Sequence, residues 1–389
     1  MVDSNPDDLR APWGSIRRCA EGVGVLPGSA YADAAVYRAE ADLFRRHWVS
    51  VACGQNVPEP GDAFPLRIHD QSLLLVRGEQ GELRVFYNLC RHRGARLVDA
   101  PCRVAGARIR CPYHAWSYHL DGRLASAPHF YRGAQAGGPD AEEAAQRGLL
   151  PLRSAVWRDV VFVNLSGDAP PFEEVIRPLD ERMAHWPAEE LSPLSSDEVD
   201  LPADWKLAAE NFVDAYHLAV VHPEIGGGFS GALVSEDLVI SPGILGISMP
   251  QGYGEGSGQE KSPLPRFSRL AEDQRLRVEA FCVFPNTLIL VEPDNQQVIV
   301  LRPQAPGITH QTFANYLVSE ASQAPELADA RAELYRSAVE INEQDRKLLT
   351  GLQQARSMDV SEFLRPAAAW DDSNLRFQRL WAREFLAGG

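Results

Sequence analysis

Two short cysteine–histidine pairs constrain what this chain can fold into more than any other feature of its sequence. Cys90 and His92 have one residue between them, Cys111 and His114 have two, and 18 residues lie between the pairs. Thiolates suit zinc or an iron–sulfur cluster, and imidazole raises the potential of such a cluster. The fold must therefore place two ligand loops face to face around a metal centre.

The order of the four ligands favours iron–sulfur over zinc. Structural zinc sites usually combine a cysteine pair with a separate histidine pair, whereas each half of this motif mixes the two residue types. Two unrelated cysteines beside surface histidines would require the same coincidence twice. A Rieske cluster holds one iron with two cysteines and the other with two histidines. We therefore predict a Rieske-type [2Fe–2S] cluster on Cys90, His92, Cys111 and His114.

Bulk properties bound the class of the protein and its partners. The chain has 389 residues, of which 45% are hydrophobic and 23% charged, which is ordinary for two or three globular domains. The net charge of −15 argues against nucleic acid or an anionic membrane as the main partner, and leaves room for a basic patch on a redox partner. The first residues, MVDSNPDDLR, lack the order of a signal peptide. We expect a cytoplasmic protein.

The chain changes character along its length. Residues 44–165 contain short apolar segments separated by turn residues, such as those at 79–81 and 121–122, which is typical of β-structure. Residues 166–389 mix helical candidates with strands around 233–250, 278–291, 297–303 and 311–318, an α+β pattern. We expect three parts, with residues 1–43 packing on the domain formed by 166–389.

A second polar site is indicated in residues 204–222, which we expect to form one largely apolar helix. At about 100° per residue, four polar residues fall on one face of that helix, namely Glu210, Asn211, Asp214 and His217. Buried polar groups require partners, and a metal ion is one possibility. We take Asp214 and Asn211 as candidate catalytic residues.

His222 extends this site if the helix ends before it. His217 and His222 are five residues apart, so they can face one ion only where the helix stops or distorts between them. Pro223 provides the reason, because a proline disfavours helical geometry in the residue before it. Two histidines and one carboxylate form the common oxygen-activating Fe(II) site.

The carboxylate can be sought in the helix expected over 325–356. Its apolar stripe is formed by Leu327, Leu334, Ala338, Ile341, Leu348 and Leu352. Asp345 falls within the stripe, where an unpaired charge would be costly and a cation would compensate it. Glu343, which lies off the stripe, and Asp214, which is close to His217, are the alternatives, and a salt bridge to Arg or Lys would also accommodate Asp345.

The motifs resemble those of one family. NLCRHRGARL, CPYHAWSYHLDGRL and the DAYH…HP segment are similar to Rieske non-haem iron oxygenases, specifically the alpha (terminal oxygenase) subunits of the ring-hydroxylating and choline-monooxygenase-like group. The resemblance is strong in 44–165 and 200–223, and thins beyond 225 to a single acid, Asp345. It implies that His217, His222 and Asp345 bind a mononuclear Fe(II), and that Asp214 links His217 to His114 of a neighbouring subunit.

The resemblance also implies a fold and an activity. The expected fold is α+β, with an all-β Rieske domain near the N-terminus and a catalytic domain of helix-grip type with an antiparallel sheet. The expected activity is hydroxylation or oxidative demethylation of a small organic substrate with O2. Electrons would come from an NAD(P)H-dependent reductase or ferredoxin, because the chain has no nucleotide-binding motif. A homotrimer is the usual assembly.

Two other functions and the substrate remain open from the sequence. The alternatives are cis-dihydroxylation of an aromatic ring, and a Rieske electron-transfer protein without oxygenase activity. Aromatic residues on expected strands would suit an arene or a quaternary ammonium group, but they are also ordinary sheet core: Phe281, Phe284, Phe313 and Tyr316. Glycine-rich segments at 226–228 and 251–262 are either pocket lids or plain connectors.

Overall fold

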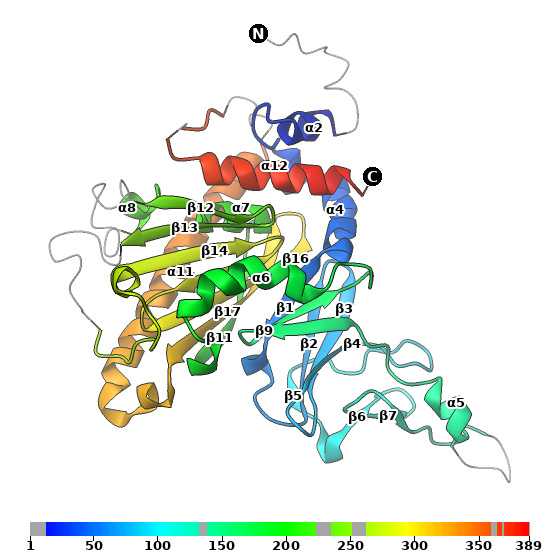
Figure 1. Ribbon diagram of the computed structural model, residues 1–389. Helices are drawn as coiled ribbons and strands as arrows, with labels where there is room; N and C mark the ends of the chain where they lie inside the picture. Colours follow the sequence, from blue (N-terminus) through cyan, green and yellow to red (C-terminus); the bar gives the residue numbers. More distant parts are fainter. Residues whose placement is uncertain are drawn as a thin grey trace. The chain divides into compact units, whose positions relative to one another are not determined.

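The structure is a computed structural model that describes residues 13–131, 138–222, 235–250, 262–358, 364–367 and 369–388 (Figure 1). The chain forms two compact units. Residues 48–169 form one unit, which we call the β unit, and residues 1–47 with 170–389 form the other, which we call the α+β unit. The observed division lies within a few residues of the expected boundaries at 44 and 165, and it places the N-terminal segment in the same unit as the C-terminal half.

In its described residues, the β unit contains three antiparallel sheets. The first has the order β1 (Trp48–Cys53), β10 (Val160–Asn164), β9 (Arg153–Trp157). The second has the order β4 (Leu83–Tyr87), β3 (Gln71–Arg77), β2 (Asp62–Ile68), β5 (Cys102–Arg103). The third has the order β6 (Arg108–Arg110), β7 (Ser117–His119), β8 (Leu124–Ser126), and a short helix, α5 (Ala141–Ala145), follows it.

Tight turns connect these strands where the sequence predicts them. Residues 79–81 join β3 to β4, and residues 121–122 lie in the turn between β7 and β8. Gly122 has a φ of 88°, and a Cβ there would lie 2.6 Å from a ring carbon of Phe86. Only glycine satisfies both the left-handed backbone and this close approach. The hairpin that follows the second ligand pair is therefore fixed by a local sequence signal.

The α+β unit is built on a seven-stranded antiparallel sheet in the described residues. Its order is β11 (Leu191–Leu201), β17 (Ile308–Val318), β16 (Asn295–Ala305), β15 (Thr287–Val291), β14 (Arg277–Val283), β13 (Ile244–Pro250), β12 (Glu236–Ser241). The segments expected as strands at 233–250 and 278–291 each contain a two-stranded hairpin. Strand β11, a polar edge strand, was not expected.

Eight α-helices accompany this sheet in the described part of the chain. They are α2 (Gly14–Ala20), α3 (Ser29–Ala32), α4 (Ala34–Arg46), α6 (Phe172–Arg182), α7 (Trp205–Phe212), α8 (Leu218–Val221), α11 (Ala328–Arg356) and α12 (Asp372–Leu386). Figure 1 shows α6 in front of the sheet and α11 behind it. The antiparallel sheet with a long helix against it is the α+β, helix-grip arrangement that the resemblance implied.

Strand alternation assigns side chains to the two faces of this sheet. On β14, Glu279 points to α6, where its carboxylate pairs with Arg182. Ala280 and Val278 point the other way and pack with Ala215 and other residues of the α7–α8 region. Because successive strand residues face opposite sides, the face lined by Ala280 is the one that carries the second polar site.

A buried polar network joins the N-terminal segment to this face. Glu40 of α4 accepts hydrogen bonds from Trp205 Nε1 (2.9 Å), Trp381 Nε1 (2.7 Å) and Lys206 Nζ (2.7 Å). Asp204 lies 2.8 Å from the same ammonium. All of these side chains are buried. The network therefore fixes the start of α7 against α4 and α12.

The long helix differs from its expected packing. α11 begins at Ala328, close to the predicted start, but Leu352 is 38% exposed whereas Leu349 and Gln353 are buried. A straight helix drifts relative to a strict heptad repeat, so the buried stripe moves round by one position over this length. The stripe proposed from the sequence is therefore wrong at its C-terminal end.

None of the helices among the described residues combines the length and hydrophobicity needed to cross a bilayer. The six cysteines all lie in the described residues, and none of them forms a disulfide.

Candidate metal centres

Two tight loops of the β unit carry the cysteine–histidine pairs. The Cys90 N–H donates to the carbonyl of Ala95 (2.8 Å), and the Cys111 N–H donates to the carbonyl of Trp116 (2.7 Å). Each loop is thus closed on itself immediately around its two ligand positions. This is how a segment with no helix or long strand can hold two side chains in a fixed orientation.

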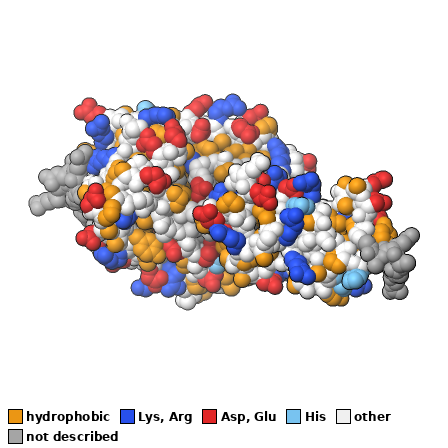
Figure 2. Space-filling view, turned by 90° about the horizontal axis from the view of Figure 1, so that it is seen from below, with side chains coloured by type: hydrophobic (Ala, Val, Ile, Leu, Met, Phe, Trp, Pro, Cys, Tyr) orange, Lys and Arg blue, Asp and Glu red, His pale blue; other side chains and the backbone are white. Residues whose placement is uncertain are grey.

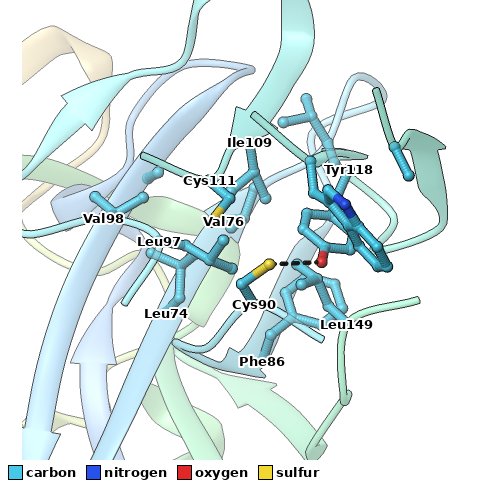
Figure 3. Close-up of a cluster of buried hydrophobic side chains, with 14 residues drawn as sticks. Leu74, Val76, Phe86, Cys90, Leu97, Val98, Ile109, Cys111, Tyr118 and Leu149 are labelled. Atoms are coloured by element: carbon cyan, nitrogen blue, oxygen red, sulfur yellow. Dashed lines mark hydrogen bonds between the residues drawn. The ribbon is translucent and has the colours of Figure 1, made fainter. Parts of the chain in front are cut away.

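The four side chains divide into a buried pair and an exposed pair. The Cys90 and Cys111 thiols are buried in the apolar cluster shown in Figure 3, while His92 and His114 are exposed. The two imidazole rings lie with their centroids 4.8 Å apart, and His92 stacks on Trp116 at 4.8 Å. Two thiols on the inner side and two imidazoles on the outer side fit the ligand set of a Rieske cluster.

Tyr118 is a further residue of this site that the sequence did not point out. Its hydroxyl lies 3.2 Å from the Cys90 Sγ and accepts a hydrogen bond from the Arg91 N–H at 3.0 Å (Figure 3). The hydroxyl oxygen thus accepts from Arg91, and the hydroxyl proton can be donated to a Cys90 thiolate. The signal was available in principle, because alternation on β7 places Tyr118 inward between two outward residues.

The pKa directions of two of these residues, Cys90 and His92, bear on metal binding. Burial raises the pKa of the Cys90 thiol, against the hydrogen bond from Tyr118, so that two adjacent thiolates here require a cation. Burial, with the neighbouring charges of His114 and Arg93, lowers the pKa of His92. A neutral imidazole is the form that ligates a metal.

In the α+β unit, the expectation of a continuous helix over 204–222 is wrong. α7 ends at Phe212, and the chain turns before α8 begins. The Asp214 carboxylate accepts hydrogen bonds from the N–H groups of Tyr216 (2.8 Å) and His217 (3.3 Å). Such side-chain bonds to the backbone compete with helix formation, which explains the interruption.

The interruption changes the polar face that the sequence suggested. Glu210 is buried elsewhere, where it accepts hydrogen bonds from Tyr31 Oη (2.6 Å) and Gln378 Nε2 (2.9 Å). Asn211 contacts Asp214 through its backbone carbonyl, which accepts the Asp214 N–H at 3.2 Å. Of the four residues predicted to share a face, only Asp214 and His217 have side chains in contact with each other.

Three ligand atoms converge at the end of α8. His217, His222 and Asp345 each contribute one side-chain atom, and these three atoms lie within 4.8 Å of one another. The Asp345 Oδ1 is 3.0 Å from the His222 Nε2 and 3.7 Å from the His217 Nε2. α8 ends at Val221, and His222 has a φ of −121° and a ψ of 63°, outside helical geometry. Two imidazoles and one carboxylate at this spacing fit an Fe(II) site with open positions.

The second nitrogen of each imidazole also has a partner. The His217 Nδ1 lies 3.1 Å from the Asp214 carboxylate, and the His222 Nδ1 lies 2.5 Å from the Gln344 amide oxygen. An Nδ1–H donated to these oxygens leaves each Nε2 as the ligand atom. Gln344 was not predicted, because its role depends on a contact between residues distant in the sequence.

The alternative carboxylate, Glu343, is engaged elsewhere. Its oxygens accept two hydrogen bonds from the guanidinium of Arg346 at 2.6 and 2.8 Å. Asp345 is partly buried, with a side chain 22% exposed, and its described neighbours are the two histidines. The structure thus brings Asp345 rather than Glu343 to His217 and His222.

An apolar cluster, which we call the apolar wall, includes Ala215 and Leu218 on either side of His217 in the sequence. It is formed by Phe212, Ala215, Leu218, Ile247, Met249, Val278, Ala280 and Leu290. The aromatic residues considered from the sequence lie mainly in the core: Phe284 packs on Trp205 and Phe377, and Phe281 is fully buried on the opposite face of the sheet. Pro223 and the glycine-rich segments 226–228 and 251–261 lie outside the described residues.

Comparisons with known proteins agree with this geometry. Residues 47–136 match the family described as Rieske [2Fe-2S] domain, and residues 188–388 match the ring hydroxylating alpha subunit (catalytic domain). The first match contains all four cluster ligands, and the second contains His217, His222 and Asp345. The chain belongs to the family of ring-hydroxylating alpha subunits. It has a Rieske [2Fe–2S] domain and a catalytic domain of the kind that holds a mononuclear non-haem iron.

The chain is also similar to individual relatives and solved structures. The chain is 33% identical over 210 residues to the glycine betaine monooxygenase oxygenase subunit of Chromohalobacter salexigens, a region that covers 54% of this chain and 45% of that protein. The alignment thus spans about half the length of that relative. The fold is similar to a quaternary ammonium Rieske monooxygenase (TM-score 0.73, 22% identity) and to naphthalene 1,2-dioxygenase from Rhodococcus sp. (TM-score 0.77, 21% identity), each over 99% of both chains.

Proposed function

We propose that this chain is the terminal oxygenase component of a Rieske oxygenase system, which hydroxylates or oxidatively demethylates a small organic substrate. The observation that carries the proposal is the convergence of His217, His222 and Asp345 in the chain that also holds Cys90, His92, Cys111 and His114. Family membership supports it. The glycine betaine relative supports a monooxygenase in particular.

The protein side chains prepare the second centre. Asp214 and Gln344 orient the two imidazoles, so that both Nε2 atoms face Asp345. The apolar wall from Phe212 to Leu290 would exclude water from a substrate bound beside it. His217, His222 and Asp345 would hold Fe(II), and the bound ion would supply the activation of O2.

The electron route of the proposal passes between subunits. Asp214 contacts His217 within its own chain and joins it to His114 of a neighbouring subunit, so that the carboxylate bridges the two centres. His114 is exposed, as such a contact requires. Each subunit must then both give and receive this contact, and a closed ring, a homotrimer, satisfies the requirement. The external donor is an NAD(P)H-dependent reductase or ferredoxin, in the cytoplasm.

A methylammonium compound is the substrate class that we favour. Phe212 brings an aromatic ring to the apolar wall, and a quaternary ammonium group is attracted to such a ring. In the reaction, two electrons and two protons reduce O2; one oxygen atom enters a methyl C–H bond and the other leaves as water. The resulting N–CH2OH group breaks down to formaldehyde and the amine with one methyl group fewer.

The experiment that tests this function is coupled oxygen uptake with a panel of substrates. The purified protein, with a plant-type ferredoxin and its NADPH-dependent reductase, is offered glycine betaine, carnitine, salicylate and naphthalene. Formaldehyde release equal to oxygen uptake with one of the ammonium compounds supports demethylation. A cis-diol or phenol from an arene supports ring hydroxylation. The absence of oxygen uptake with all four compounds would contradict the proposal for these substrate classes.

The Asp345→Ala variant tests the second metal centre. We expect it to lose oxygen uptake and the mononuclear iron, so that iron falls from about three to about two per chain, while the visible absorption of the cluster stays. Glu343→Ala is the matched control, because it removes a carboxylate two residues away that pairs with Arg346. Unchanged iron content and activity in Asp345→Ala would show that Asp345 is not a metal ligand, whereas about two irons per chain and no oxygen uptake in the wild type would favour a plain Rieske electron carrier.

A further inference from the structure

A groove of about 640 Å³ lies in the β unit beside the ligand loops. Its apolar walls include Leu97, Val98 and Ala115, and its charged walls include Arg103, Arg108 and Arg110. We call it the arginine groove. Figure 2 shows blue side chains beside pale-blue histidines toward the right-hand end of that view, and the β unit contains no lysine, so its blue side chains are arginines.

The charge of the groove is positive. Asp99 is the acidic residue among its lining residues. Arg103 is paired with Asp62 at 2.9 Å, but its side chain stays 59% exposed. Arg110 is exposed and takes part in no ion pair within the described ranges. The groove therefore offers guanidinium groups to a ligand rather than using them all internally.

The surrounding sequence is basic on an otherwise acidic protein. Residues 48–169 contain 14 arginines and 12 acidic residues, whereas the whole chain has a net charge of −15. Within residues 93–110, which connect the two ligand pairs, there are five arginines and one acid, Asp99. The net negative charge of the whole chain left room for a basic surface on the redox partner. The local positive charge beside the cluster instead predicts an acidic surface on that partner.

The groove adjoins the cysteine side of the ligand loops. Leu97 and Val98, which line it, also pack in the apolar cluster around Cys90 and Cys111. In the proposed function, the exposed imidazole of His114 faces the neighbouring subunit. A cluster that receives electrons needs an approach for its donor, and the groove provides one that is lined by Leu97 and Val98 near the thiols and by Ala115 after His114.

We propose that the arginine groove is the docking surface for an acidic electron-donor protein. The inference rests on the proposed function, since it assumes that electrons come from outside the chain. One electron moves from the reduced iron of the donor to a ferric ion of the cluster, no bond is made or broken, and the oxidised donor then leaves. Charge complementarity steers the encounter and raises its rate.

The test is stopped-flow reduction of the cluster by a plant-type [2Fe–2S] ferredoxin, which is an acidic protein. Arg110→Glu should lower the second-order rate constant about 5- to 10-fold at low ionic strength, and the difference should shrink at about 0.5 M salt, where charges are screened. The rate constant of Arg110→Gln should fall between those of Arg110→Glu and the wild type, and that of Arg110→Lys should stay near the wild-type value. Reduction by photoreduced deazaflavin, a small molecule, should be unchanged in every variant.

Arg84→Glu is the matched control, because Arg84 lies on β4 in the same unit, outside the groove, and is similarly exposed. Equal rates for Arg110→Glu and Arg84→Glu would overturn the proposal. So would a change in oligomer mass in Arg110→Glu, which would show that the groove holds the acidic surface of a second copy. The readout is reduction of the cluster without substrate or O2. The test of docking can therefore fail or succeed whether or not the chain is an oxygenase.

Discussion

At the scale of single residues, both centres depend on the side chains that contact their ligands. Asp214 and Gln344 occupy the Nδ1 atoms of His217 and His222, and Tyr118 directs its hydroxyl at Cys90. These partners set tautomer, orientation and electron density at the ligand atoms. We expect their substitution to change the potential of a centre or the electron transfer between centres before it changes the fold.

Tyr118→Phe should lower the reduction potential of the cluster. The hydroxyl–sulfur hydrogen bond stabilises the reduced, more negative state, and losing about 1 kcal/mol of that preference corresponds to about 40 mV for one electron. A redox titration followed by visible absorption measures the change. Tyr113→Phe, a substitution at an exposed tyrosine in the same ligand loop, is the control. A potential equal to that of the wild type would show that the contact has no electronic effect.

Residue identity could be predicted where the chemistry is local. The mixed order of Cys90, His92, Cys111 and His114 is enough by itself to indicate the cluster. Asp345 could be proposed because a charge on an apolar helix face needs a partner. Gln344 could not, because glutamine is an ordinary residue on a helix and its contact with His222 joins segments 122 positions apart.

At the scale of elements, the interruption between α7 and α8 is the feature that periodicity missed. An apolar pattern continues through residues 204–222, so it cannot show where the helix breaks. The break arises because the Asp214 side chain takes the N–H groups that the helix would use. The same carboxylate that contacts His217 therefore also shapes the backbone that presents it.

The start of α7 is held by buried charges, and Lys206→Met tests this support. Removing the ammonium leaves Glu40 and Asp204 buried without their cation, and breaking such a group typically costs about 3–5 kcal/mol. We expect a lower urea midpoint for the transition reported by tryptophan fluorescence. Lys347→Met, on the exposed side of α11, should leave the midpoint unchanged. An unaltered midpoint in Lys206→Met would mean that the network adds nothing to stability.

At the scale of the whole molecule, the chain is divided so that one compact unit interrupts another. Residues 13–47 pack with the C-terminal half through contacts such as the Leu26 N–H to Gln378 at 3.0 Å. Turn signals and composition predicted the β unit well, because hairpins are local. The order of the seven strands could not be predicted, because it depends on pairings between distant segments such as β11 and β17.

In the proposed function the two centres of this family member work together, with Asp214 as the link. The direct measurement is single-turnover stopped flow, in which the reduced protein is mixed with O2 and substrate, and reoxidation of the cluster is followed by its absorption. Asp214→Asn should keep both metals and slow reoxidation by about 100-fold, whereas Asp329→Asn, an exposed substitution on α11, should not. Fast reoxidation in Asp214→Asn, with both metals retained, would contradict the account.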